Sequence, residues 1–176
     1  MFKNIRAVLC LFVLTVFAAT LFPAPARAGD PRLVGTYGDW SVYVFLEDGN
    51  KVCYMLSSPK KAEGKYSQRG DVYVMITDRP VESTRNVFSY MAGYGYKPNS
   101  DATLTIDGEK FTLFTKDETA WAPDAATDEK ILKAISKGAN MVVKGSSARG
   151  TVTTDTFSLK GSGQAHEALA KECGLQ

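Results

Sequence analysis

A hairpin signal between residues 104 and 114 constrains this chain more than any other feature of its sequence. Asp107-Gly108 separates two short runs, within Leu104–Phe114, in which apolar and polar residues alternate. Alternation with a period of two places one set of side chains on each face of a strand. Asp-Gly between such runs supplies the positive φ angles that a tight hairpin turn requires. The segment therefore predicts two antiparallel strands.

Similar strand signals recur along the chain. Trp40–Val44 alternates, and the turn residues Asp48-Gly49-Asn50 lead into Val52–Leu56, which predicts a second hairpin. Further strands are predicted where β-branched and aromatic residues gather, with Pro80 marking a connection between the first two of them. These strands are residues 72–77, 87–91, 141–144 and 151–159.

Two short helices are predicted in the second half of the chain. In the first, Thr127 is the expected N-cap, Asp128 and Glu129 suit the positive end of the helix dipole, and Gly138 ends the helix. Its apolar stripe consists of Ile131, Leu132 and Ile135. The second helix follows Gly161-Ser162-Gly163, has Ala165, Ala168 and Leu169 on one face, and stops at Gly174.

The fold class follows from the order of these elements. Roughly eight strands, two short helices and no alternation of strand with helix indicate a mainly β domain. We expect an antiparallel β-sandwich, or alternatively a partly open β-barrel, with two short α-helices, the second at the C-terminus.

The first 28 residues have the pattern of a secretory signal peptide. Lys3 and Arg6 precede the apolar run Ala7–Phe22, and Pro23–Ala28 ends in small residues suited to a signal peptidase. The run is shorter than the roughly 18 to 20 apolar residues of a membrane-spanning helix. We expect cleavage after Ala28, a single domain at 29–176 without a stable membrane span, and a periplasmic location with possible outer-membrane association or surface exposure.

The charge of the exported chain excludes one class of partner. The leader holds three of the 21 basic residues and none of the 19 acidic residues, so 18 basic and 19 acidic side chains remain. A net charge of −1 gives no electrostatic basis for binding nucleic acid or anionic lipid.

Two cysteines remain after the leader and its Cys10 are removed, Cys53 and Cys173. In an oxidising compartment this number indicates one disulfide. The bond would tie the second strand to the last helix. A redox function is the alternative, but the chain has no Cys-x-x-Cys pair to lower the pKa of a thiol.

Groups suited to catalysis are scarce. His166 is the only histidine of the chain and is expected to be an ordinary helix residue, so no metal site, cofactor or catalytic residue is predicted. Ser57 and Ser58 precede Lys60 and Lys61 with the Ser-x-x-Lys spacing of penicillin-recognising enzymes. That motif requires a helix, which Pro59 opposes, so a solvated loop explains the same residues.

Two loops contain candidate interaction residues. Arg69-Gly70-Asp71 matches a tripeptide that integrins recognise, although a turn before the next strand accounts for Gly-Asp equally well. In the glycine-spaced loop 93–98, Tyr94 and Tyr96 are a candidate interaction surface, because exposed tyrosines stack well on ligands and partners. Alternatively, they cover the end of the sandwich.

Several segments lie along the chain in the order and spacing of a known family: Gly38-Asp39-Trp40, Lys51–Met55, Asp78-Arg79-Pro80, Thr105–Gly108, Trp121–Asp128 and Ser158–Gly161, the last followed by a short Ala/Leu helix. Together they resemble the invasion-associated locus B family of exported alphaproteobacterial proteins. The resemblance implies host-cell invasion or envelope function, linked to virulence, without a known enzymatic activity. This chain departs from the commoner family pattern in having no cysteine just after Trp40 and no cysteine pair near Trp121.

Three functional hypotheses follow. The first is a non-catalytic periplasmic module that binds an envelope or host protein, and the sequence sets neither its ligand nor its oligomeric state. The second is a small periplasmic serine–lysine hydrolase, and the third is a surface adhesin acting through residues 69–71.

Overall fold

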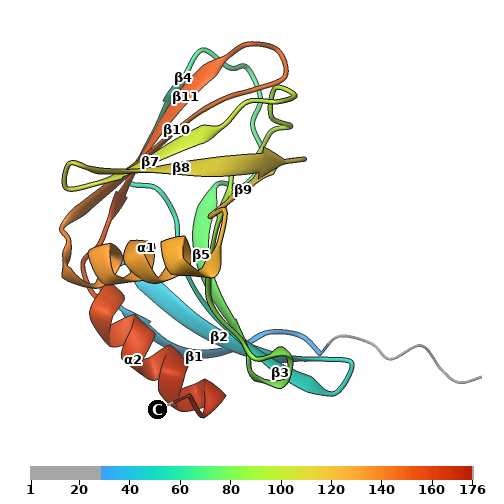
Figure 1. Ribbon diagram of the computed structural model, residues 1–176, viewed down its shortest axis with the longest axis vertical. Coiled ribbons are helices and arrows are strands. Elements are labelled where there is room, and N and C mark those ends of the chain that lie inside the picture. Colours follow the sequence, from blue (N-terminus) through green and yellow to red (C-terminus); the bar gives the residue numbers. More distant parts are fainter. Residues whose placement is uncertain (1–28, 176) are drawn as a thin grey trace, which may run out of the picture.

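Eleven antiparallel strands form one sheet in the computed structural model, which describes residues 29–175 (Figure 1). The predicted signal peptide, its cleavage site and Cys10 lie outside the described residues. The order of the strands across the sheet is β1-β2-β3-β5-β6-β9-β8-β7-β10-β11-β4. Their bounds are β1 Arg32–Tyr37, β2 Trp40–Glu47, β3 Asn50–Ser57, β4 Lys61–Gly64, β5 Tyr73–Arg79, β6 Thr84–Met91, β7 Ala102–Ile106, β8 Glu109–Lys116, β9 Thr119–Trp121, β10 Asn140–Ser146 and β11 Val152–Ser158.

The sheet folds back on itself at β8 and β9. β8 pairs with β7 through Glu109–Leu113 and with β9 through Phe114–Lys116, so one strand belongs to both halves of the sheet. We call β1, β2, β3, β5 and β6 the first layer, and β7, β10, β11 and β4 the second layer. Figure 1 shows the second layer at the top and the first layer below it. Tyr90 of β6 packs edge-on against Phe157 of β11, with ring centroids 6.2 Å apart, so the layers share one core.

The sheet is not closed, because β1 and β4 each pair with one strand only among the described residues. This confirms a mainly β, antiparallel fold of the predicted sandwich or open-barrel kind. The core contains side chains from both layers and from α1 and α2. Its largest fully buried members are Trp40, Tyr90, Phe88, Phe157, Met55, Ile76, Leu104, Leu113, Ile131, Ile135, Met141 and Leu169.

Both predicted Asp-Gly turns are confirmed. Asp107 and Gly108 have φ angles of 44° and 98°, and they join β7 to β8. Asp48 and Gly49 have φ angles of 51° and 81° and join β2 to β3, while Asn50 already belongs to β3. Pro80 begins a 3-10 turn, η1 (Pro80–Glu82), between β5 and β6, which agrees with the predicted connection. Strands β1, β4 and β9 were not predicted.

The first helix, α1 (Ala125–Lys137), begins a turn earlier than the sequence indicated. Its N-cap is Asp124, whose side chain accepts a hydrogen bond of 2.7 Å from the backbone N–H of Thr127. The predicted cap at Thr127 is therefore wrong, because the extended Asp124 already caps the first turn. The predicted stripe of Ile131, Leu132 and Ile135 is buried, and Gly138 is the C-cap as expected.

The second helix, α2 (Ser162–Cys173), lies beside α1 and packs against the first layer (Figure 1). Gly161 precedes it, where an added Cβ would lie 2.1 Å from the main-chain oxygen of Tyr37. Asp39 N donates a 2.9 Å hydrogen bond to Lys160 O at the same crossing. Glycine is therefore required where the start of α2 crosses the β1–β2 turn. The helix ends at Gly174, as predicted.

No helix among residues 29–175 is both long and apolar enough to cross a membrane.

Candidate binding cleft

A cleft of about 430 Å³ opens between three loops at the end of the two layers. The loops are the β4–β5 connection, the segment after β6, and the β10–β11 connection. Its volume lies within the range of small-molecule sites. We call it the Tyr94 cleft, and its lining residues are Lys65, Tyr66, Ser67, Gln68, Tyr94, Gly95, Ser147, Ala148, Arg149, Thr151 and Thr153.

Arg69, which follows the lining residues of the β4–β5 loop, is bound by a buried carboxylate. Its Nη1 and Nη2 donate to the two carboxylate oxygens of Asp155 on β11 at 2.8 and 2.7 Å. The Arg69 side chain is 5% exposed and that of Asp155 is 0% exposed. Nε of Arg69 also donates to Ala92 O at 2.7 Å, so the guanidinium fixes the loop to both layers. A bidentate, buried pair of this kind holds a definite geometry.

Tyr90 completes this polar cluster inside the core. Its hydroxyl donates to Asp155, and it accepts a hydrogen bond of 3.0 Å from Arg69 Nη2. Burial, with the neighbouring Asp155 charge, raises the pKa of Tyr90 above its usual value, so the hydroxyl keeps its proton. Burial alone would lower the pKa of Arg69, but the hydrogen bonds that it donates to Asp155 raise that pKa, so the guanidinium stays charged.

This arrangement bears directly on the Arg69-Gly70-Asp71 hypothesis. An adhesive tripeptide must present its arginine to a receptor, whereas the Arg69 guanidinium is buried against Asp155. Gly70 N donates to Gly93 O at 2.9 Å, which makes the segment part of a connection between loops. The segment therefore lies in the irregular connection before β5, with its arginine side chain turned inward.

The predicted interaction residue Tyr94 lines the cleft. Its ring and that of Tyr66 lie on the Arg69 guanidinium, with centroids 5.2 and 5.3 Å from Cζ. The hydroxyls of Tyr94 and Thr153 share a hydrogen bond of 2.7 Å, and the Tyr66 hydroxyl donates to Ala62 O at 3.1 Å. Cation–π contacts and hydrogen bonds therefore hold both rings in place before any ligand arrives.

The second predicted residue, Tyr96, is placed differently. It is 7% exposed and belongs to the core, with its ring edge-on to Tyr94 at 5.3 Å. Among residues 29–175 its hydroxyl has no hydrogen-bond partner, and burial raises its pKa above the usual value. Tyr96 therefore supports Tyr94 from beneath and does not form part of the surface.

Gly145 on β10 makes room for this pair of tyrosines. A Cβ at this position would lie 2.8 Å from Cε1 of Tyr96 and 2.9 Å from the hydroxyl oxygen of Tyr94. Both distances are shorter than an ordinary van der Waals contact, so the rings pack directly on the glycine backbone. This role could not be predicted, because Gly145 falls between the predicted strands 141–144 and 151–159 and its contacts come from a distant loop.

The serine–lysine pair of the hydrolase hypothesis is not assembled. The Ser57 hydroxyl donates to Asp39 O at 2.7 Å, while Lys60 Nζ forms an ion pair of 2.5 Å with Asp39 Oδ1. Lys61 pairs with Glu63 at 2.9 Å on the exposed strand β4. The hydrogen bond and charge of Lys60 lower the pKa of Asp39, which keeps that carboxylate ionised. Ser58 is exposed in the connection to β4.

His166 lies on α2 beside the side chain of Asn86, with Nε2 3.2 Å from Asn86 Oδ1. Asn86 Nδ2 in turn donates to Glu129 of α1 at 2.7 Å. Within residues 29–175 no group of three or more His, Cys, Asp or Glu side chains is arranged to hold a metal ion. His166 thus takes part in a bridge between α2, β6 and α1.

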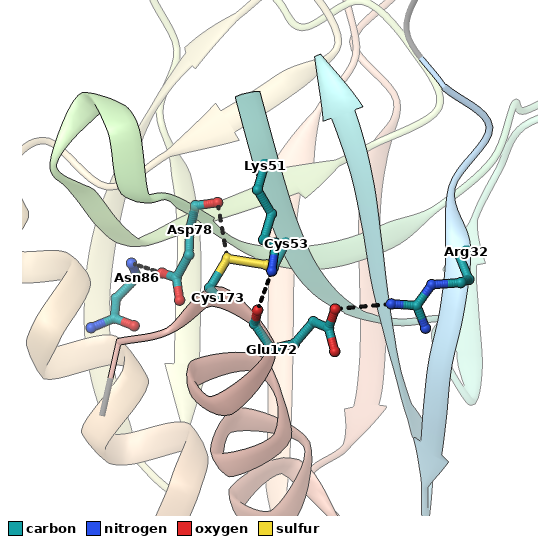
Figure 2. Close-up of a disulfide and its surroundings, with 7 residues drawn as sticks. All are labelled: Arg32, Lys51, Cys53, Asp78, Asn86, Glu172 and Cys173. Atoms are coloured by element: carbon teal, nitrogen blue, oxygen red, sulfur yellow. Dashed lines mark hydrogen bonds and ion pairs between the residues drawn. A yellow bond between two sulfur atoms is a disulfide. The ribbon is translucent and has the colours of Figure 1, made fainter. Parts of the chain in front are cut away.

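A disulfide closes the opposite end of the first layer, where Cys53 of β3 is bonded to Cys173 at the end of α2 (Figure 2). Glu172, next to it, accepts from Arg32 Nη2 and from Lys51 Nζ, both at 2.9 Å (Figure 2). These contacts attach the end of α2 to β1 and β3. The predicted bond between the second strand and the last helix is present; in the structure, Cys53 is on β3.

Two buried carboxylates accept hydrogen bonds from backbone N–H groups of β6. Asp78 accepts from Asn86 N at 2.7 Å, and Asp128 of α1 accepts from Phe88 N at 2.8 Å (Figure 2 shows the first contact). Burial raises the pKa of Asp78 and of Asp128, although both amide hydrogen bonds act in the other direction. Asp128 lies in the first turn of α1, as expected from the helix dipole, and it is 7% exposed and bound to β6.

Comparison with known proteins gives two matches. The family described as "Invasion associated locus B (IalB) protein" matches residues 40–170. The crystal structure of invasion associated protein B from Bartonella henselae aligns with a TM-score of 0.55 at 16% sequence identity, covering 78% of this chain and 95% of that chain. At this identity the structural match shows a shared fold. No curated protein sequence matches the chain.

Proposed function

Because the chain belongs to the invasion associated locus B family, we propose that it is an exported, non-catalytic binding protein of the cell envelope. It acts in the periplasm, and its partner is an envelope or host component that is bound at the Tyr94 cleft. Any contribution to host-cell invasion is indirect, through the envelope. The exported state is supported by the signal-peptide pattern of residues 1–28 and by the disulfide.

The observation that carries this proposal is the fixed pair of aromatic rings at the cleft. Tyr66 and Tyr94 are positioned by Arg69, whose own position is set by the buried Asp155. Rings that are already ordered lose little conformational entropy when a ligand stacks on them. A buried salt bridge beneath a cleft serves such an arrangement, because it fixes geometry more than it adds stability.

The proposal is tested by capture from a gently solubilised envelope fraction. Immobilised protein is expected to retain a saturable partner, and Tyr94→Ala is expected to weaken retention because it removes one ring of the pair. Phe114→Ala is the matched control, since Phe114 is an aromatic residue of β8, 45% exposed, that does not line the cleft. Retention that is equal for both variants and the wild type would argue against the cleft.

The non-catalytic part of the proposal has its own measurement. A fluorophosphonate probe and a penicillin probe are expected to leave the protein unlabelled, because the Ser57 hydroxyl and the Lys60 amine are both directed to Asp39. Labelling that disappears in Ser57→Ala or Ser58→Ala would contradict it.

The periplasmic location is tested by protease treatment of cells. The protein is expected to be protected in intact cells and digested after the outer membrane is opened.

A further inference from the structure

The charges around the Tyr94 cleft all have one sign. Lys65 and Arg149, from two different loops, line it, and none of the described lining residues is acidic. Neither side chain takes part in an ion pair with another residue of the range 29–175. The third nearby cation, Arg69, is neutralised by Asp155 beneath the cleft. The cleft is therefore complementary to an anion, which Lys65 from one loop and Arg149 from another can both approach.

The remaining lining combines two aromatic rings with polar side chains. Apart from Tyr66 and Tyr94, its apolar residues are Ala148 and Gly95, so the cleft lacks a large aliphatic side chain that would hold a hydrocarbon chain. Hydroxyls and one amide supply both hydrogen-bond donors and acceptors. These groups belong to Tyr66, Ser67, Gln68, Tyr94, Ser147, Thr151 and Thr153.

Parts of this lining are held in place by hydrogen bonds. Ser147 Oγ accepts from Thr151 N at 3.1 Å, and the Tyr94 and Thr153 hydroxyls are joined at 2.7 Å. The β10–β11 loop is also tied to the segment after β6, because Ala148 N donates to Gly95 O at 2.8 Å. Walls fixed in this way favour a compact, rigid ligand over an extended flexible chain.

A ligand that matches all three properties has a compact ring, many hydroxyls and an acidic group. Resting on the binding role proposed above, we infer that the Tyr94 cleft binds an acidic sugar, a saccharide unit that carries a carboxylate or a phosphate. The C–H face of the ring packs on Tyr66 or Tyr94, the hydroxyl-rich loops hydrogen-bond the sugar hydroxyls, and Lys65 and Arg149 hold the anion. Free sugars and units of an envelope polysaccharide share this chemistry.

The test is a titration of the purified exported protein with three ligands, in which binding is monitored by calorimetry and by the NMR shifts of the cleft amides. D-Glucuronate supplies the ring and the anion together, D-glucose supplies the ring alone, and acetate supplies the anion alone. We expect D-glucuronate to bind with shifts at residues 65–68 and 147–153. The affinities for D-glucose and for acetate should each be at least roughly tenfold lower than that for D-glucuronate, since each lacks one set of contacts. Binding should weaken as salt is added.

Three variants of equal charge change locate the anion. Lys65→Gln and Arg149→Gln are each expected to weaken D-glucuronate binding by about three- to tenfold, as for partly exposed ion pairs. Lys110→Gln is the control, because Lys110 lies on the exposed start of β8 and does not line the cleft. It should leave binding unchanged. An equal effect of all three variants would overturn the assignment, because it would reflect net charge only.

Other outcomes overturn the inference in distinct ways. Equal binding of D-glucose removes the acidic requirement, equal binding of acetate reduces the site to a general anion site, and absence of cleft shifts with all three removes the sugar. If Tyr94-dependent capture of an envelope partner persists without sugar binding, the binding role survives and this inference fails. Binding of a uronic-acid polysaccharide more tightly than D-glucuronate identifies a polymer as the source, and the reverse identifies the free sugar.

Discussion

The two ends of the first layer are held by different chemistry. At one end, the Cys53–Cys173 disulfide joins β3 to α2, and the ion pairs around it lie near the surface. At the other end, Arg69 and Asp155 form a buried ion pair that joins a loop to β11 and, through Tyr90, to β6. The covalent end can be opened by reduction, whereas the ionic end depends on two charges that the fold shields from solvent.

Only one of these two ends lies beneath the candidate binding surface. The disulfide secures a helix against the sheet, and its neighbours Arg32 and Glu172 form an exposed pair of the kind that contributes little to stability. The buried ion pair lies directly under the two tyrosines of the Tyr94 cleft. A bidentate ion pair fixes orientation as well as distance. The ionic end is therefore the one suited to position side chains for binding.

Removal of the disulfide is expected to have the largest effect on stability. Cys53→Ala with Cys173→Ala should lower the free energy of unfolding by about 4–5 kcal/mol, because the bond closes a loop with a sequence separation of 120 residues. Urea unfolding followed by tryptophan fluorescence measures this loss. The wild type under a strong reductant is the control and should lose as much. A loss below about 1 kcal/mol would mean that the helix contacts alone hold α2 in place.

Breaking the buried ion pair should be nearly as costly. Asp155→Asn keeps the shape of the side chain but leaves the Arg69 charge buried without its counter-ion, which destabilises proteins by about 3–5 kcal/mol. The same unfolding measurement tests it. Glu172→Gln is the matched control, since it removes an exposed pair worth about 1 kcal/mol or less. Equal losses of stability in Asp155→Asn and Glu172→Gln would contradict the view that the ionic end depends on its buried pair more than the disulfide end depends on its exposed pair.

Gly145→Ala sharpens the comparison at the ionic end alone. The added methyl group meets Tyr94 and Tyr96 at 2.8–2.9 Å, so overpacking is expected to cost about 1–3 kcal/mol and to displace Tyr94. Amide NMR shifts should concentrate in the cleft and leave residues near Cys53 unchanged. Gly150→Ala is a useful contrast, because its Cβ would meet no atom but its φ of 81° is unfavourable for alanine. Unchanged Tyr94 resonances in Gly145→Ala would contradict the packing described.

The smallest effect concerns the pH dependence of two buried carboxylates bound to β6. The pKa values of Asp78 and Asp128 are raised in the folded state by burial, so both carboxylates oppose folding while they are ionised. Their unfavourable contribution is complete above the folded pKa and is relieved as the pH falls toward the unfolded value near 3.8. Asp78→Asn should therefore gain stability relative to the wild type at neutral pH, and the gain should shrink on acidification.

Unfolding curves of wild type and Asp78→Asn between neutral pH and pH 4 measure this difference. Asp71→Asn is the control, because Asp71 is exposed. A difference that is constant with pH would show that the Asp78 carboxylate has an ordinary affinity for protons in the fold.

Local sequence signals predicted much of this fold because hairpins and helix ends depend on neighbouring residues. Asp48-Gly49 and Asp107-Gly108 specify their own turns, and Gly138 and Gly174 end their helices. Strand β4 was missed since its four residues are all exposed and show no apolar pattern. It is a strand through its pairing with β11, which is a tertiary interaction. β9, with three residues, is too short for a periodic signal.

The candidate site was predicted in part. Tyr94 was identified from its glycine-spaced loop and lies in the cleft, whereas the same reasoning included Tyr96, which the fold buries. The Arg69–Asp155 pair could not be predicted, because 86 residues separate its members. One signal was present nonetheless: Thr153, Asp155 and Phe157 alternate on the buried face of β11, and a charge at a core position requires a buried partner.

The position of the disulfide along the chain has a consequence for biosynthesis. Cys53 leaves the ribosome long before Cys173, which is the fourth residue from the end of the sequence. Residues 29–176 contain no other thiol, so an incorrect internal bridge is impossible and a truncated product cannot close the ring. An oxidant that takes up the two thiol protons and electrons can therefore form this bond only after both β3 and α2 have been synthesised.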